Sequence, residues 1–252
     1  MSAKQFIILF VSLMVIINSY ALENESVPLL PVEVDLHDQA GLQRGAKMFM
    51  NYCSGCHSLK YMRYNKMATD LGLTTFDGEI DKDLLFNNLI FTSAKIHDPI
   101  KIGLPAADAK QWFGTLPPDL SLIARVRGAS WLYTFLKSFY LDPSRPFGSN
   151  NLLIPGVAMP NVLAPLAGQI IAIRETNQKG APINHLLKLE DGEMTTQEFD
   201  NAIEDLVNFL VYVGEPVQLT RYRIGVFIIA FLCIFLIVVY LLKRSYWSRL
   251  PH

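Results

Sequence analysis

Cysteine is scarce in this chain, which has three cysteines in 252 residues. Cys53 and Cys56 lie close together, and Cys233 lies within a long apolar run near the C-terminus. A structural zinc ion takes four ligands, so this number and placement of cysteines argue against a structural zinc site. A thioredoxin-like redox pair would need a βαβ pattern around it, and the sequence shows neither that pattern nor an internal repeat.

Acidic residues are missing from both ends, since all 23 lie between residues 22 and 220. Lys4 precedes the uncharged apolar run 6–17, and Ser19-Tyr20-Ala21 then provides a small-x-small cleavage site. This layout is typical of a secretory signal peptide covering residues 1–21, with a retained N-terminal anchor as the alternative. Either one places residues 22–220 outside the cytoplasm, in a bacterial periplasm or a comparable oxidising space.

The second apolar run, residues 224–242, contains nineteen residues without a charge. As a helix rising about 1.5 Å per residue, it would just span a hydrocarbon core of about 30 Å. Lys243 and Arg244 follow it, which favours a cytoplasmic tail over residues 243–252. We therefore expect a single-pass protein of the inner membrane, in contact with lipid. A buried core helix is the alternative.

The expected periplasmic domain is acidic. Residues 22–220 contain 16 basic and 23 acidic residues, which gives a net charge of −7. Such a surface attracts a basic soluble partner and repels nucleic acid. The alternative is that the acidic residues only keep the domain soluble.

Cys53-Ser54-Gly55-Cys56-His57 is the pattern of a c-type haem attachment site. The two thiols can add to the vinyl groups of the haem, and the adjacent histidine is then placed to bind the iron. This use of Cys53 and Cys56 leaves no cysteine pair for a disulfide framework.

An iron that only passes electrons needs a second protein ligand opposite His57, and methionine raises the reduction potential relative to a second histidine. Met159 is the best candidate, because prolines brace its loop on both sides in the run 154–160. Ordinary core packing is the alternative role for this methionine. The histidine alternatives are His37, His97 and His185, of which only His97 lies in a long loop.

Apolar spacing predicts a mainly α domain without strand-rich stretches. Helices are expected over residues 38–52, 81–89, 130–139 and 195–213, with a further helix start at 118–126. Residues 92–118 and 142–165 are rich in proline and glycine and are expected to be loops. Gly45 and Phe49 lie on one face of the first helix, where the glycine would let that helix cross the 195–213 helix closely.

Taken together, these residues resemble the cytochrome c1 family, the haem-bearing subunits of quinol–cytochrome c reductase (the cytochrome b–c1 complex). The resemblance covers most of the chain after residue 21. It is carried by Arg44-Gly45, the run 53–65, the run 112–125 with Pro117-Pro118-Asp119-Leu120-Ser121, the Met159-Pro160 loop, and a C-terminal span ending in Lys243-Arg244-Ser245-Tyr246-Trp247. Residues 170–192 have no family counterpart that we can place.

The resemblance implies a class I cytochrome c-like domain with long loop insertions and a C-terminal transmembrane helix. It also implies one haem c, with Cys53 and Cys56 as attachment points and His57 and Met159 as iron ligands. Three residues would assist: Arg125 and Tyr133 would face the haem propionates, and the carbonyl of Pro118, or of Pro117, would fix the His57 ring.

The implied partners are cytochrome b, a Rieske iron–sulfur protein and a basic cytochrome c, within a dimeric complex. The chain alone would catalyse no bond chemistry, but would carry one electron from the Rieske protein to cytochrome c. The alternative is a free-standing, membrane-anchored cytochrome c that serves a terminal oxidase. In ordinary class I cytochromes the two ligands lie closer in sequence than His57 and Met159, which are 102 positions apart. A haem sensor or enzyme with an open iron site is a third possibility.

Overall fold

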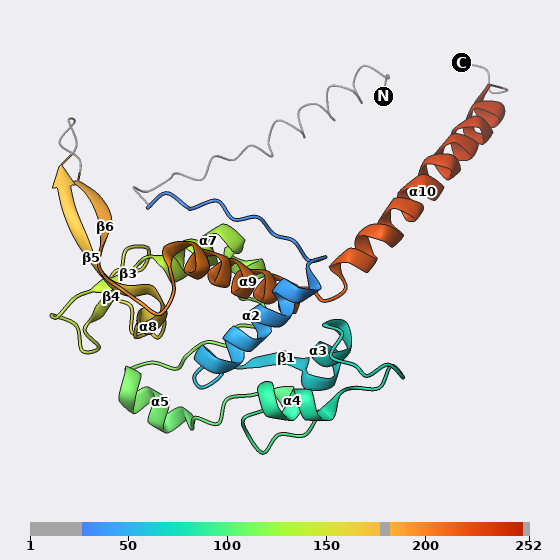
Figure 1. The fold of residues 1–252 in the computed structure, drawn as a ribbon. Helices are drawn as coiled ribbons and strands as arrows, with labels where there is room; N and C mark the ends of the chain where they lie inside the picture. The colour runs from blue at the N-terminus through green and yellow to red at the C-terminus, as the bar shows by residue number, and fades with distance from the viewer. Residues whose placement is uncertain (1–26, 177–181, 249–252) are drawn as a thin grey trace.

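The computed structural model describes residues 27–176 and 182–248, so the predicted signal peptide lies outside the described residues. Nine helices lie within these ranges (Figure 1): α2 (Gln39–Tyr52), α3 (Tyr64–Asp70), α4 (Lys82–Asn88), α5 (Ala106–Phe113), α6 (Ile123–Arg127), α7 (Ala129–Lys137), α8 (Ala164–Ala167), α9 (Thr196–Gly214) and α10 (Gln218–Trp247). Short strands form three antiparallel pairs: β1 (Leu59–Arg63) with β2 (Pro99–Ile100), β3 (Phe139–Leu141) with β4 (Ser149–Asn151), and β5 (Gly168–Thr176) with β6 (Pro182–Asp191).

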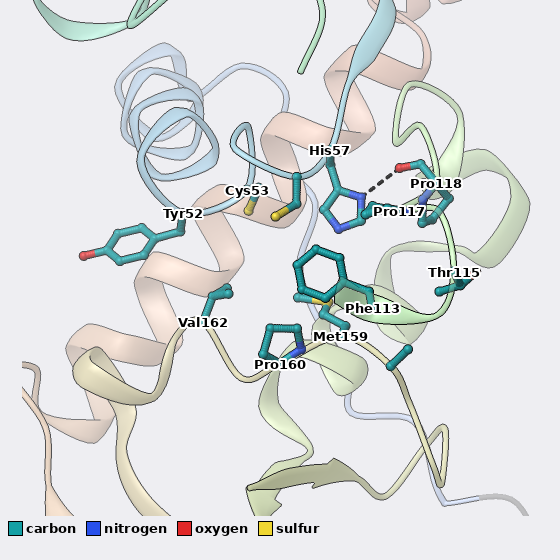
Figure 2. Close-up of a pocket in the computed structure, with 12 residues that line it drawn as sticks. Tyr52, Cys53, His57, Phe113, Thr115, Pro117, Pro118, Met159, Pro160 and Val162 are labelled. Atoms are coloured by element: carbon teal, nitrogen blue, oxygen red, sulfur yellow. Dashed lines mark hydrogen bonds between the residues drawn. The ribbon is translucent and has the colours of Figure 1, made fainter. Parts of the chain in front are cut away.

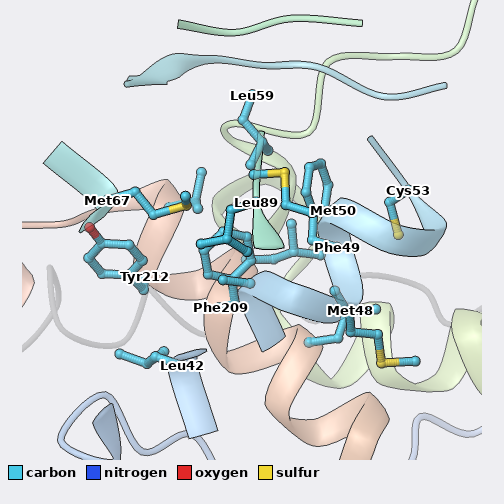
Figure 3. Packing of buried hydrophobic residues seen from close by; sticks show 14 of the residues in the cluster. Leu42, Met48, Phe49, Met50, Cys53, Leu59, Met67, Leu89, Phe209 and Tyr212 are labelled. Carbon is cyan, nitrogen blue, oxygen red and sulfur yellow. The ribbon is translucent and has the colours of Figure 1, made fainter. Parts of the chain in front are cut away.

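The packing of α2 against α9 forms the centre of the domain (Figures 1 and 3). Each helix begins at a side-chain cap. Asp38 accepts a hydrogen bond from the Gly41 N–H, and Thr195 forms a reciprocal capping box with Glu198. The rings of Phe49 and Phe209 pack together at 5.9 Å in the fully buried core between the helices. Both helices were predicted from sequence, and the structure confirms them.

Gly45 lies at the point of closest approach between α2 and α9. A Cβ atom added there would lie 2.1 Å from the carbonyl oxygen of Asp205 and 2.8 Å from the Cβ of Phe209. Neither neighbour is the end of a flexible side chain, so the two helices would have to separate. The structure thus confirms the close crossing expected from Gly45.

We expect Gly45→Ala to lower the free energy of unfolding by about 3 kcal/mol, because it overpacks a rigid helix contact. Chemical denaturation followed by circular dichroism would measure the change. Gly103→Ala is the matched control, because a Cβ at that position meets no atom within 4 Å. It should stay within about 0.5 kcal/mol of the parent protein. Equal effects of the two substitutions would contradict the proposed role of the crossing.

Several regions differ from the sequence-based expectation. Residues 168–176 and 182–191, where no strands were expected, form the antiparallel pair β5–β6, which extends away from the helices (Figure 1). A bulge between Gln169 and Ile170 interrupts the alternation of side chains between the two faces of the hairpin. Because Leu187 and Leu189 are about half exposed, the hairpin lacks a clean pattern of one buried and one polar face. Within the predicted loop 92–118 the chain forms β2 and α5, and within the predicted loop 142–165 it forms β4. The helix start expected at 118–126 is found later, as the short helix α6.

The C-terminal helix α10 contains 30 residues and follows α9 after a three-residue junction, 215–217. In the described part of the chain it is the one helix long and apolar enough to cross a membrane, with a mean hydropathy of 3.2 in its most apolar window. Its side chains are largely exposed along its length. At about 1.5 Å per residue it is about 45 Å long, the thickness of a bilayer with its headgroup layers. Residues 224–242 therefore have the form of a membrane span.

Candidate haem-binding site

A cavity of about 550 Å³, a volume that includes the open solvent at its mouth, lies beside the C-terminal end of α2 (Figure 2). Three segments form its wall: the end of α2 with the turn after it, the loop after α5, and the loop after β4. The lining residues are Tyr52, Cys53, Cys56, His57, Phe113, Thr115, Pro117, Pro118, Ala158, Met159, Pro160 and Val162.

Cys53, Cys56 and His57 are held in one tight turn at the end of α2. The Cys53 N–H donates to the Phe49 carbonyl at 2.9 Å, and the N–H groups of Cys56 and His57 donate to the Cys53 carbonyl at 3.0 and 2.8 Å. Burial, with a smaller contribution from Cys56, raises the pKa of the Cys53 thiol to about 12. This thiol is therefore protonated at neutral pH and does not act as a reactive thiolate. Both motif cysteines are unpaired and lie on the cavity wall.

The His57 ring is oriented by Pro118 (Figure 2). Its Nδ1 lies 2.8 Å from the Pro118 carbonyl oxygen. Because a carbonyl only accepts hydrogen bonds, Nδ1 carries the proton and Nε2 keeps its lone pair. Burial lowers the pKa of His57, although Pro118 and Asp119 act in the opposite direction. The ring is thus held in the neutral form and orientation that a metal-binding histidine needs. The expected contact with Pro118 is present.

The Pro-Pro-Asp-Leu-Ser run, residues 117–121, holds the loop after α5 against β1 through hydrogen bonds. Asp119 accepts from the Lys60 N–H at 2.9 Å, and Ser121 Oγ accepts from the Tyr61 N–H at 3.2 Å. The Leu120 N–H donates to the Ser58 carbonyl at 2.9 Å. These bonds hold the loop against the start of β1, and they explain why α6 begins only after them. They also fix the Pro118 carbonyl beside His57.

Met159 lies across the cavity from His57, on the loop that follows β4 (Figure 2). Within residues 27–176 and 182–248, no other methionine and no other histidine line this cavity. Met62 and Met67 are instead fully buried in the core, and His97 lies exposed in its loop. Two thiols, an imidazole with its Nε2 unoccupied and an opposed thioether, within a largely apolar wall, match the donor set of a c-type haem. The residues present therefore fit this cofactor.

Two predicted site residues do not line the cavity. Arg125 is exposed and lies against Gly214, at the C-terminal end of α9. Tyr133 is buried, and its hydroxyl accepts a hydrogen bond from Lys137 Nζ at 3.3 Å. Lys137 is also paired with Asp200 at 2.6 Å. Their assignment to the haem propionates stays a prediction from the resemblance.

The cavity also contains residues that the sequence did not identify. Phe113 covers part of the wall, with Tyr52 and Val162 on other parts. Phe113 lies within the run 112–121, one of the segments on which the resemblance rests. Its position in that run could have indicated that it lies at the site. Nothing in the sequence alone distinguished Tyr52 or Val162 from ordinary packing residues.

The donor set and the helical domain around it define a haem-binding cytochrome domain, followed by an apolar C-terminal helix. The model of the Cytochrome C1 family matches residues 32–250. The chain therefore belongs to the cytochrome c1 family, and this membership implies a haem cofactor.

Three relatives cover most of the chain. It is 50% identical to cytochrome c1 of Allochromatium vinosum over 218 residues, which are 85% of this chain and 86% of the relative. It is 40% identical to a Nitrosomonas europaea protein named ammonia monooxygenase gamma subunit, over 88% of this chain and 89% of the relative. Identity to cytochrome c1 of Rhodospirillum rubrum is 27%, over 86% and 84% of the two chains.

Proposed function

We propose that this chain is the electron-transfer subunit of a quinol–cytochrome c reductase, the cytochrome b–c1 complex. It takes one electron at a time from a Rieske iron–sulfur protein and passes it to cytochrome c. The main support for this proposal is that His57 and Met159 face each other across one cavity, in a chain of the cytochrome c1 family. The chain itself breaks and forms no bond in a substrate.

One haem c, attached through Cys53 and Cys56, would supply the reversible Fe(II)/Fe(III) couple. His57, oriented by Pro118, and Met159 would hold its iron as the two protein ligands. Because both donors belong to backbone segments held by hydrogen bonds, their geometry need not change with the charge on the iron. The apolar side chains of Phe113, Pro160 and Val162 line the site and would make it less favourable for water.

The domain lies on the periplasmic side, with α10 as its anchor in the inner membrane. Lys243 and Arg244 follow the apolar segment and favour the cytoplasm for the C-terminus. Trp247 is exposed near the same end, with Lys243 Nζ 5.9 Å from the centre of its ring, as suits the headgroup layer. The net charge of −7 over residues 22–220 would steer a basic cytochrome c toward this domain.

Affinity purification of the full chain from its native membranes in mild detergent tests the assignment. We expect it to copurify with a b-type cytochrome and an iron–sulfur protein, as a dimer that reduces cytochrome c with quinol. The rate should fall as ionic strength rises, because salt screens the attraction between the acidic domain and the basic acceptor. A haem-containing chain that is isolated alone and shows no quinol oxidation would instead favour the free-standing carrier.

A further inference from the structure

Strand β4 consists of three polar residues that are all buried. Ser149 is 8% exposed, Asn150 is 9% exposed and Asn151 is fully buried. Burying a hydroxyl or an amide is costly unless its hydrogen bonds are satisfied. The partners of these side chains therefore indicate why polar residues occupy this position.

Most of these partners lie in one segment, the Met159 loop, which we define as residues 152–161. Asn151 Oδ1 accepts from the N–H groups of Leu153 and Ile154, at 2.9 and 3.1 Å. Asn150 Oδ1 accepts from the Gly156 N–H at 2.8 Å. These bonds hold the loop three to six residues before Met159.

Beyond Met159, Ser149 Oγ accepts from the Asn161 N–H at 3.1 Å. A further contact to the loop comes from Arg145, whose Nη2 donates to the Gly156 carbonyl at 2.7 Å. The loop is thus held on both sides of Met159 by side chains that do not line the haem cavity.

The two amides are locked in the orientation that serves the loop. Asn150 Nδ2 donates to Asp142 Oδ2 at 2.9 Å, and Asn151 Nδ2 donates to the Phe135 carbonyl at 2.8 Å. A hydrogen bond from the Ser144 hydroxyl, and then one from Asn150, lower the pKa of Asp142, so it stays an acceptor-only carboxylate. Each amide must therefore direct its oxygen toward the loop.

We propose that Ser149, Asn150 and Asn151 are positioning residues that keep Met159 at the haem iron. The proposal rests on the proposed function, in which Met159 is the second axial ligand. A methionine–iron bond that opens leaves a vacant position, which a small external ligand can take. The β4 side chains reduce this opening because the loop cannot move away without losing their hydrogen bonds.

The test uses the full-length, haem-loaded protein in detergent. The rate of carbon monoxide binding is measured after reduction, and the rate of imidazole binding is measured in the oxidised state. Asn150→Ala should increase both rates by about tenfold or more, since it removes the bond to Gly156 and leaves that N–H without its partner. The sulfur-to-iron charge-transfer band should weaken in parallel.

Ser149 provides a milder pair of variants in case Asn150→Ala fails to load haem. Ser149→Ala removes one oxygen atom and should increase both rates severalfold, whereas Ser149→Thr keeps the hydroxyl and should bind both ligands at the parent rate. Tyr212→Phe is the control for general destabilisation, because it removes the partly buried 2.7 Å bond from the Tyr212 hydroxyl to Asp70, away from the haem cavity. It should lower the free energy of unfolding without raising either rate.

One outcome would overturn the positioning role of the β4 side chains, and a different outcome would overturn the role of Met159 as an iron ligand. If Asn150→Ala and Ser149→Ala bind both ligands no faster than Tyr212→Phe, the positioning role is wrong even though Met159 remains the ligand. If the parent protein already binds carbon monoxide as fast as Met159→Leu, Met159 is not an iron ligand, and that part of the proposed function fails.

Discussion

Replacing Met159 by leucine should abolish the sulfur-to-iron charge-transfer band of the oxidised protein. Leucine has nearly the same volume but no donor atom, so the position opposite His57 is left to water or to added ligands. We expect the reduced protein to bind carbon monoxide rapidly, whereas the parent protein does not. The reduction potential should fall by on the order of 0.1 V or more, within the roughly 0.8 V range that axial ligands control.

Met67→Leu is the matched control for this substitution. Met67 is fully buried in the core and does not line the haem cavity. Exchanging methionine for leucine in a core conserves volume and normally costs less than about 1.5 kcal/mol. The control should therefore keep the band, the potential and the resistance to carbon monoxide. An unchanged spectrum in Met159→Leu would exclude Met159 as the ligand and return attention to histidines such as His97.

Changing both Cys53 and Cys56 to serine should release the haem. Serine keeps the approximate size of cysteine but cannot form the stable thioether bond to a haem vinyl group. After denaturation in acid acetone, we expect nearly all the pigment of the double variant in the extract and nearly all the pigment of the parent protein on the polypeptide. Haem staining after denaturing electrophoresis would give the same answer independently.

Cys233→Ser separates this effect from a general loss of cysteine. Cys233 lies in the middle of α10, on its exposed surface and far from the haem cavity in sequence. This variant should retain all of its pigment on the chain. If the parent protein itself loses its haem to acid acetone, the covalent attachment is wrong, whatever the variants show.

Most of the donor residues that line the candidate haem cavity could be picked out from the sequence, because their chemistry leaves few alternatives. Cys-x-x-Cys-His fixes one side of the cavity by its spacing, and a proline-braced loop made Met159 the best second donor. Helices α2 and α9 were predictable for a related reason: caps and apolar stripes mark them locally. For the motif, for the Met159 loop and for both helices, a few residues that are close in sequence are enough to make the prediction.

The β5–β6 hairpin and the β4 strand lacked such a signal. Ile170 packs against the core while Leu187 and Leu189 are about half exposed, so burial in the hairpin does not follow a simple period of two. In β4, three consecutive polar residues resemble a surface turn. Their burial depends on the N–H groups of residues 153–161, which only the folded chain brings to them. Arg125, in α6, was assigned to the site only through the resemblance; it lies against Gly214 at the end of α9, and its role at a haem propionate stays a prediction.

The short junction between α9 and α10 limits how far the haem domain can move relative to the apolar helix. Only residues 215–217 separate the core helix from the apolar helix, and Glu215 forms an ion pair with Arg221 across this junction. Three extended residues reach about 10 Å at most. If the chain carries electrons as proposed, so short a connection prevents its haem domain from swinging between a donor and an acceptor that lie far apart. The donor and the acceptor would then have to come to the haem domain.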